Sequence, residues 1–172
     1  DERCAGTVLA PKPLDGVKLG RYACGEELEW QGEGEEAYMC GIGTFCHEFS
    51  HVIGLPDYYD IDYGNNYKNG LTPMEWTLMD GGSYNGDGYC PPNYSIFDKY
   101  YMGWCTPTNL HSAQNVTLTT DYGSGYQINA SGSLANYNNS STQYYVEYRK
   151  NYQISDAGWD KALPGHGMLV WK

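Results

Sequence analysis

Hydrophobic positions follow a helical spacing in two stretches of the chain and a strand-like alternation in several others. Residues 44–53 and 96–102 repeat apolar side chains at helical intervals, which predicts two amphipathic helices. The alternating stretches predict strands separated by turns of Gly, Asn and Ser, at residues 17–24, 116–120, 125–128, 143–148 and 167–171. Because most of these strands follow the second helix, we expect a first part over residues 1–108 and a β-rich part over residues 109–172.

Both predicted helices have recognisable ends. Thr44 is a suitable N-cap for the first helix, and Gly54 lets the backbone leave it. The second helix begins with Ser95 and Asp98 in the spacing of a capping box and ends before Gly103. The apolar side of the first helix is expected to face the core through Phe45, Phe49, Val52 and Ile53.

The first helix carries a metal-binding pattern. His47 and His51 stand four residues apart, so a helix places them on one face where they can hold one metal ion. After the helix ends at Gly54, Asp57 can return a carboxylate as a third ligand. Two imidazoles, one carboxylate and an open fourth position are typical of a catalytic zinc site.

Glu48 completes the chemistry that this pattern predicts. Zinc bound by His47, His51 and Asp57 would activate a water molecule for attack on a peptide bond. Glu48 would then act as the general base that takes the proton of that water and delivers it to the leaving amine. An ordinary amphipathic helix is the alternative, but it would need separate partners for each of these buried polar groups.

The balance of charge excludes some partners. The formal net charge is −11 at pH 7, whereas nucleic acids and anionic membranes bind basic patches. No apolar run approaches membrane-spanning length, and the first residues do not form a signal peptide. We therefore expect neither a nucleic-acid partner nor a membrane span.

The six cysteines suggest an oxidising compartment and disulfide bonds. None of them has the close paired spacing of a zinc knuckle. Cys90 and Cys105 are the expected local bridge. Together with the many tyrosines and few lysines, this favours a secreted, extracellular, periplasmic or cell-surface protein.

Oxygen-rich side chains after the metal motif suggest calcium as a second candidate ion. Asp60, Asp62 and Asn65 are the candidate ligands, although their spacing does not match an EF-hand loop. A hydrogen-bonded cluster of turns is the alternative. The acidic residues 25–37 are expected to form a solvated loop.

The sequence resembles the metzincin zinc metallopeptidases, and among them the immune inhibitor A-like family of secreted bacterial metalloproteases. The resemblance rests on GIGTFCHEFSHVIGLPDYYD at 41–60, WTLMDGGSYNG at 76–86 and PPNYSIFDKYYMGWCTP at 91–107. It implies an α+β fold in which a zinc helix, a Met-turn at Met79 and a C-terminal helix form a zincin-like catalytic portion ahead of a β-rich region. The same likeness implies a twisted sheet before the zinc helix, and we expect that sheet to be missing here or supplied by an N-terminal segment or chain of the same precursor.

The resemblance also implies where a substrate would bind. Residues 17–24 would be the edge strand over the cleft, with Gly20, Arg21 and Tyr22 beside an extended peptide. The residues from Met79 to about Tyr84 would line the pocket beyond the cleaved bond. The expected function is a secreted zinc endopeptidase acting on proteins or peptides; the alternative is a non-catalytic extracellular module that binds glycans or proteins.

Overall fold

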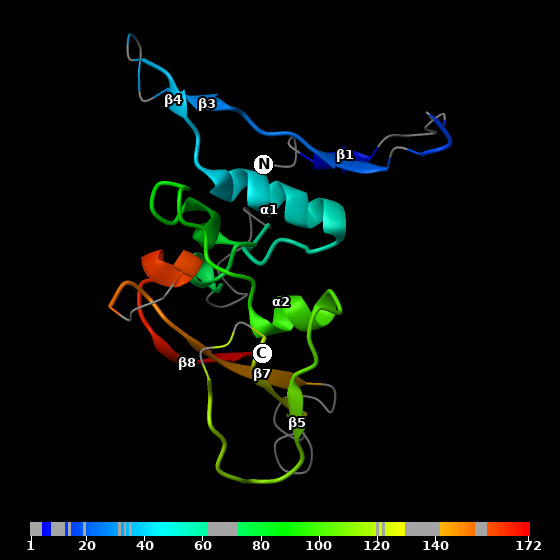
Figure 1. Ribbon diagram of the computed structural model, residues 1–172, viewed down its shortest axis with the longest axis vertical. Helices are drawn as coiled ribbons and strands as arrows, with labels where there is room; N and C mark the ends of the chain where they lie inside the picture. The colour runs from blue at the N-terminus through cyan, green and yellow to red at the C-terminus, as the bar shows by residue number, and fades with distance from the viewer. Residues whose placement is uncertain are drawn as a thin grey trace. The chain divides into compact units, whose positions relative to one another are not determined.

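The fold is described from a computed structural model of the chain (Figure 1). The described residues are 5–7, 13, 15–18, 20–30, 32, 34, 36–61, 72–119, 121, 123–129, 142–153 and 158–172. They form helices and sheets, which confirms a mixed helix and sheet fold. The chain divides into two compact units, Asp1–Pro92 and Asn93–Lys172.

The first unit contains two small sheets and the long helix α1. Strand β1 (Ala5–Thr7) pairs antiparallel with β2 (Arg21–Ala23), and β3 (Leu28–Glu29) pairs antiparallel with β4 (Tyr38–Met39). Helix α1 (Ile42–Ile53) follows, and Figure 1 shows these strands on one side of it. The acidic stretch is therefore partly a hairpin and not only a loop, because its strand β3 pairs with β4, which follows the glutamates in the sequence.

Helix α1 begins earlier than its sequence suggests. Its N-cap is Gly41, so the prediction of Thr44 was wrong. The N–H of Gly43 donates to the carbonyl of Gly88 over 2.9 Å, and this loop carbonyl replaces a side-chain cap. A Cβ on Gly43 would lie 1.8 Å from the carbonyl oxygen of Ser83, so only glycine permits the approach. At the other end Gly54 adopts φ +114°, which confirms the predicted stop.

The buried side of α1 is polar. Phe45 and Phe49 stack at 6.1 Å but remain 52% and 48% exposed, so the prediction that they face the core was wrong. The residues that α1 buries are instead Gly43, His47, Glu48 and Ser50. The reason is that α1 packs its histidine side against the segment containing the short 3-10 helix η2 (Gly81–Tyr84), where Leu78 and Met79 are buried.

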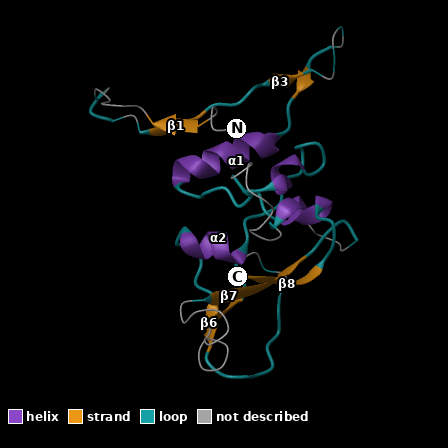
Figure 2. Cartoon of the chain, turned by 180° about the vertical axis from the view of Figure 1, so that it is seen from behind, coloured by secondary structure: helices purple, strands orange, loops and turns teal. Residues whose placement is uncertain are grey.

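The second unit is a four-stranded sheet with helix α2 (Ile96–Tyr101) against it (Figure 2). The strand order is β5 (Thr108–Leu110), β6 (Tyr126–Asn129), β7 (Gln143–Arg149) and β8 (Gly167–Trp171). The β5–β6 pair is parallel and the others are antiparallel. Ser95 and Asp98 form the predicted capping box, and the predicted strands at β6, β7 and β8 are confirmed.

Two features of this unit differ from the pattern of the sequence. The units divide after Pro92, because α2 packs on β7 through contacts of Phe97 and Tyr100 with Tyr145, at centroid distances of 5.3 and 5.6 Å. No strand forms over residues 111–119, so the strand predicted at 116–120 was wrong over its described residues. The segment 108–110 pairs with β6 instead, and much of 111–119 stays exposed.

A buried ion cluster joins β7 to the short 3-10 helix η3 (Gly158–Ala162). The Arg149 guanidinium donates to both carboxylate oxygens of Asp160 over 2.6 and 2.7 Å and to Glu147 over 3.3 Å. Glu147 also accepts from the indole of Trp171 over 2.8 Å. Burial nevertheless raises the pKa of Glu147 above its ordinary value, since desolvation outweighs the attraction of Arg149.

The predicted Cys90–Cys105 bridge is absent. No disulfide joins any two of the described cysteines, Cys24, Cys40, Cys46, Cys90 and Cys105. Cys90 is buried in the first unit, whereas the Cys105 thiol donates to the carbonyl of Ile96 in the second. Within the described residues, no helix has the length and apolar character needed to cross a membrane.

Candidate metal centre

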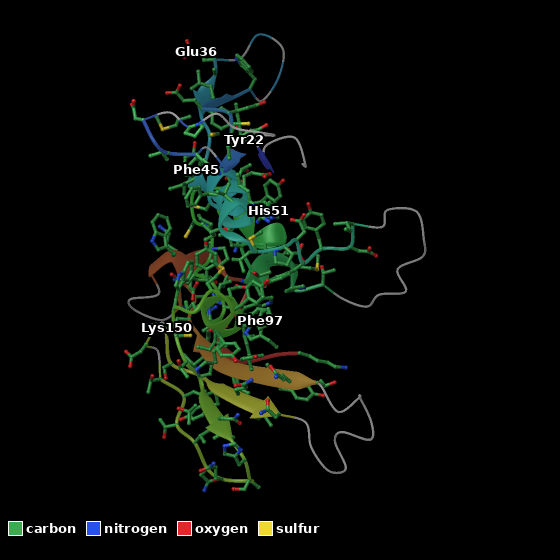
Figure 3. All side chains as sticks on the ribbon, turned by 90° about the vertical axis from the view of Figure 1, so that its right-hand side faces the viewer. Tyr22, Glu36, Phe45, His51, Phe97 and Lys150 are labelled. Atoms are coloured by element: carbon green, nitrogen blue, oxygen red, sulfur yellow. The ribbon has the colours of Figure 1, made fainter. Side chains whose placement is uncertain are left out.

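His47 and His51 lie one turn apart on α1 with their rings close together. The ring centroids are 4.8 Å apart and the planes are nearly perpendicular, at 87°. His47 is 7% exposed, and His51 is partly buried (labelled in Figure 3). Two side chains from one helix are therefore directed to one place, as the four-residue spacing predicts.

Backbone carbonyls fix the protonation pattern of both rings. The Nδ1 atom of His47 lies 2.8 Å from the carbonyl oxygen of Leu78, and that of His51 lies 2.8 Å from the carbonyl oxygen of Leu55. A carbonyl oxygen only accepts, so each Nδ1 carries the hydrogen. Each neutral ring then presents the lone pair of Nε2, which is the form that binds metals.

Asp57 supplies the third atom of the cluster. The chain turns out of α1 at Gly54 and brings Asp57 Oδ1 to 3.1 Å from His47 Nε2 and 3.2 Å from His51 Nε2. This oxygen is buried, yet the geometry gives it no hydrogen bond. All three ligand atoms lie within 4.8 Å of one another.

This donor set fits a cation of the size of zinc. With both rings in the neutral form, three lone-pair atoms face one another with no hydrogen between them, an arrangement that costs free energy unless a positive ion lies at the centre. Zinc bonds of about 2.0–2.1 Å in a tetrahedron place ligand atoms about 3.3–3.4 Å apart, close to the two distances that Asp57 shows. Among the described residues, no other group of three His, Cys, Asp or Glu side chains could hold a metal.

The turn at Leu78 and Met79 supports two of these ligands. The carbonyl of Leu78 orients His47, and the carbonyl of Met79 accepts the backbone N–H of Tyr58, the neighbour of Asp57, over 2.9 Å. The Met79 side chain is fully buried. One short turn therefore holds His47 on the helix and Tyr58, the neighbour of Asp57 in the loop, at a fixed separation.

A pocket of about 690 Å³ opens beside His47. His47 and Glu48 line it, and Glu48 is 97% buried, being only 3% exposed. No described residue gives the Glu48 carboxylate a hydrogen bond or an ion pair. A buried carboxylate without a partner, facing a pocket next to a metal ligand, is suited to exchange a proton with a bound molecule.

The other predicted site residues are distributed unevenly around this pocket. Tyr84 lines it and is 72% exposed. Gly20, Arg21 and Tyr22 are not among its lining residues; Arg21 donates instead to the carbonyl of His51 over 3.2 Å. Of the candidate calcium ligands, Asp60 is partly buried, while Asp62 and Asn65 lie outside the described residues.

Several lining residues are absent from the prediction. The acidic residues Glu26, Glu27 and Glu29 line the pocket, where the sequence suggested only a solvated loop. Tyr59 also lines it and stacks on the His47 ring at a centroid distance of 6.3 Å. The density of glutamates just before the metal helix was the available signal, but nothing in the sequence showed which way they point.

The stretch that contains this centre is similar to a known peptidase family. Residues 34–106, which contain all three ligands and Met79, match the catalytic domain of the immune inhibitor A peptidase M6 family. A protein of Arthroderma benhamiae named as a secreted metallopeptidase is 30% identical over 99 residues, covering 48% of this chain and 14% of that protein. Immune inhibitor A of Bacillus thuringiensis subsp. alesti is 36% identical over 63 residues, covering 36% of this chain and 9% of that protein.

These matches confirm the resemblance to the immune inhibitor A-like family. The chain spans only about a tenth of the length of the two relatives. No solved structure matches it significantly. The comparisons give no support to calcium as a second ion.

Proposed function

We propose that this chain carries the active site of a secreted zinc-dependent endopeptidase of the metzincin type. The observation that carries the proposal is the set of three lone-pair atoms from His47, His51 and Asp57 beside an unpartnered, buried Glu48. Each feature alone has a structural explanation, but together they supply a metal site and a proton acceptor at the same pocket. The family match and the names of the relatives support the same conclusion.

The three ligands would hold zinc, and Glu48 would move the proton. Bound zinc would supply Lewis acidity toward the peptide carbonyl and would lower the pKa of a water molecule toward about 7. Glu48 accepts a proton as the water oxygen bonds to the carbonyl carbon. It then gives that proton to the amide nitrogen as the carbon–nitrogen bond breaks, so the carboxylate is regenerated.

The chain's own contacts keep this arrangement in place. The Leu78 and Leu55 carbonyls hold the two imidazoles in the metal-binding tautomer. Met79 is proposed as the support under the ligands, through the turn described above. A peptide would lie in the 690 Å³ pocket, with Tyr84 on its rim. Gly20, Arg21 and Tyr22 remain proposed as an outer binding strand.

The test separates metal binding from catalysis. A Glu48→Gln protein should bind zinc as the wild type does, while hydrolysis of casein falls by about 10²–10⁴-fold, the range attributed to general acid–base groups. A His51→Ala protein should lose both zinc and activity. Equal hydrolysis by the wild type and Glu48→Gln at equal zinc content would remove Glu48 from the mechanism. Absence of zinc from the wild type after exposure to the metal would refute the ligand assignment.

The non-catalytic binding module is not favoured. Such a module would not need an unpartnered carboxylate beside the metal ligands, and both named relatives are peptidases or carry the name of the peptidase family.

A further inference from the structure

The pocket beside Glu48 is strongly acidic. Among the described residues that line it there is no lysine or arginine, and carboxylates are present at Glu26, Glu27, Glu29, Glu48 and Asp80. These carboxylates come from three places, which are the segment that precedes α1, the helix itself and the turn after Met79. Negative charge therefore converges on one cavity from three separate parts of the first unit.

Described neighbours do not neutralise these carboxylates. Asp80 accepts two backbone N–H groups, those of Met74 and Gly81, each over 2.7 Å. Glu29 accepts the hydroxyl of Tyr38 over 3.0 Å. These donors are uncharged, so they do not cancel the charge of the carboxylates.

The remaining three carboxylates have no described partner at all. Glu26 and Glu27 are exposed at the pocket, and their side chains make no described hydrogen bond or ion pair. Glu48 is buried and equally unpartnered. An unpartnered, buried carboxylate in a pocket favours a bound ligand, and the exposed pair favours a ligand of positive charge.

We propose that this pocket selects a basic side chain, lysine or arginine, in the peptide substrate, with Glu26 and Glu27 as the residues that determine the preference. The proposal rests on the proposed peptidase function and names its substrate class. Because Glu48 and His47 line the same cavity, the selected side chain belongs to a residue close to the cleaved bond.

The walls of the pocket fit the rest of such a side chain. Phe45, Tyr59 and Tyr84 give it aromatic surface. Lysine and arginine have apolar stems that pack on such surface while their charged ends reach polar groups, and their cations are attracted to aromatic faces. The net charge of −11 on the whole chain also favours the approach of cationic peptides.

The first experiment compares peptides that differ at one position only. Lysine is exchanged for the uncharged norleucine at each position flanking the cleaved bond, and kcat/KM is measured for each pair. At one position lysine should be preferred, and a Glu26→Gln/Glu27→Gln protein should lower the lysine-to-norleucine ratio by at least about 2-fold, since each exposed ion pair corresponds to about 1.4- to 5-fold. Raising the salt from about 0.01 M to about 1 M should reduce the ratio as well, because the Debye length falls from about 30 Å to about 3 Å.

The control removes the same charge elsewhere in the first unit. Glu36 and Glu75 are exposed and do not line the pocket. A Glu36→Gln/Glu75→Gln protein should therefore keep the wild-type ratio. If it lowers the ratio as much as the pocket variant does, the preference comes from net charge and the assignment to Glu26 and Glu27 is overturned.

A binding measurement separates this proposal from the peptidase function. Fluorescence anisotropy of the labelled peptides is followed on zinc-exposed Glu48→Gln protein, with and without the Glu26→Gln/Glu27→Gln change. Tighter binding of the lysine peptide by at least about 2-fold, lost in the combined variant, supports the proposal even if no peptide is hydrolysed. Equal affinity for the lysine and norleucine peptides overturns it, whether or not the wild type cleaves them.

Discussion

Substitution of Gly43 by alanine tests how α1 is held against the segment that supports the metal ligands. Gly43 is the second residue of α1, where helix propensity alone would favour alanine by about 1 kcal/mol. The added Cβ would lie 1.8 Å from the Ser83 carbonyl oxygen and 2.8 Å from its carbonyl carbon. Both atoms belong to the backbone, so a rotamer change cannot relieve the overlap.

The steric effect should outweigh the propensity. Overpacking costs about 1–3 kcal/mol, and displacing the loop also threatens the Gly43 N–H bond to the Gly88 carbonyl, worth about 1 kcal/mol. After the gain in propensity, we expect a net loss of about 1–3 kcal/mol in the first unit. Zinc affinity should fall too, because the displaced segment follows directly on Leu78 and Met79, whose carbonyls support His47 and Tyr58.

The assay combines thermal unfolding followed by circular dichroism with a zinc titration against a chromogenic chelator. Gly32→Ala is the matched control, since Gly32 lies in the same unit and a Cβ there would meet nothing within 4 Å. A Gly43→Ala protein with unchanged or increased stability and unchanged zinc affinity would refute the reasoning, because it would mean that the loop does not approach the helix so closely.

Three further predictions concern the metal ligands and the buried ions. Asp57→Asn should weaken zinc binding by more than the roughly 10- to 100-fold seen for outer partners of metal ligands, measured by the same titration, and unchanged affinity would remove Asp57 from the site. Asp160→Ala leaves Arg149 without its bidentate partner and should cost about 3–5 kcal/mol in urea unfolding; a loss below about 1 kcal/mol would contradict the burial of this pair. Because burial raises the pKa of Glu147 in the folded state, its favourable contribution is full below the unfolded pKa of about 4.3 and declines as pH rises through the folded pKa. The stability of wild type relative to Glu147→Gln should therefore fall as pH rises above about 4.3, and a rise over that range would reverse the assigned direction.

The sequence by itself determined the features that depend on near neighbours along the chain. The four-residue interval of His47 and His51 gives a shared helix face, Gly54 ends α1, and Ser95 with Asp98 starts α2, because these effects act within one or two helical turns. The alternation that predicts β7 and β8 also acts locally, and both strands formed there.

Only the tertiary structure decided which surfaces meet. Helical spacing gave α1 an apolar side, but packing of the glycine-containing end of α1 against Ser83 and Gly88 buried its polar side and left Phe45 exposed. The same long-range packing made Gly41 the N-cap and brought the acidic segment of Glu26 and Glu27 into the pocket of Glu48. Contacts between residues distant in sequence depend on the path of the whole chain, which no local pattern encodes. The ligands of the candidate zinc centre were therefore predictable from the sequence, whereas the charge of the pocket beside them was not.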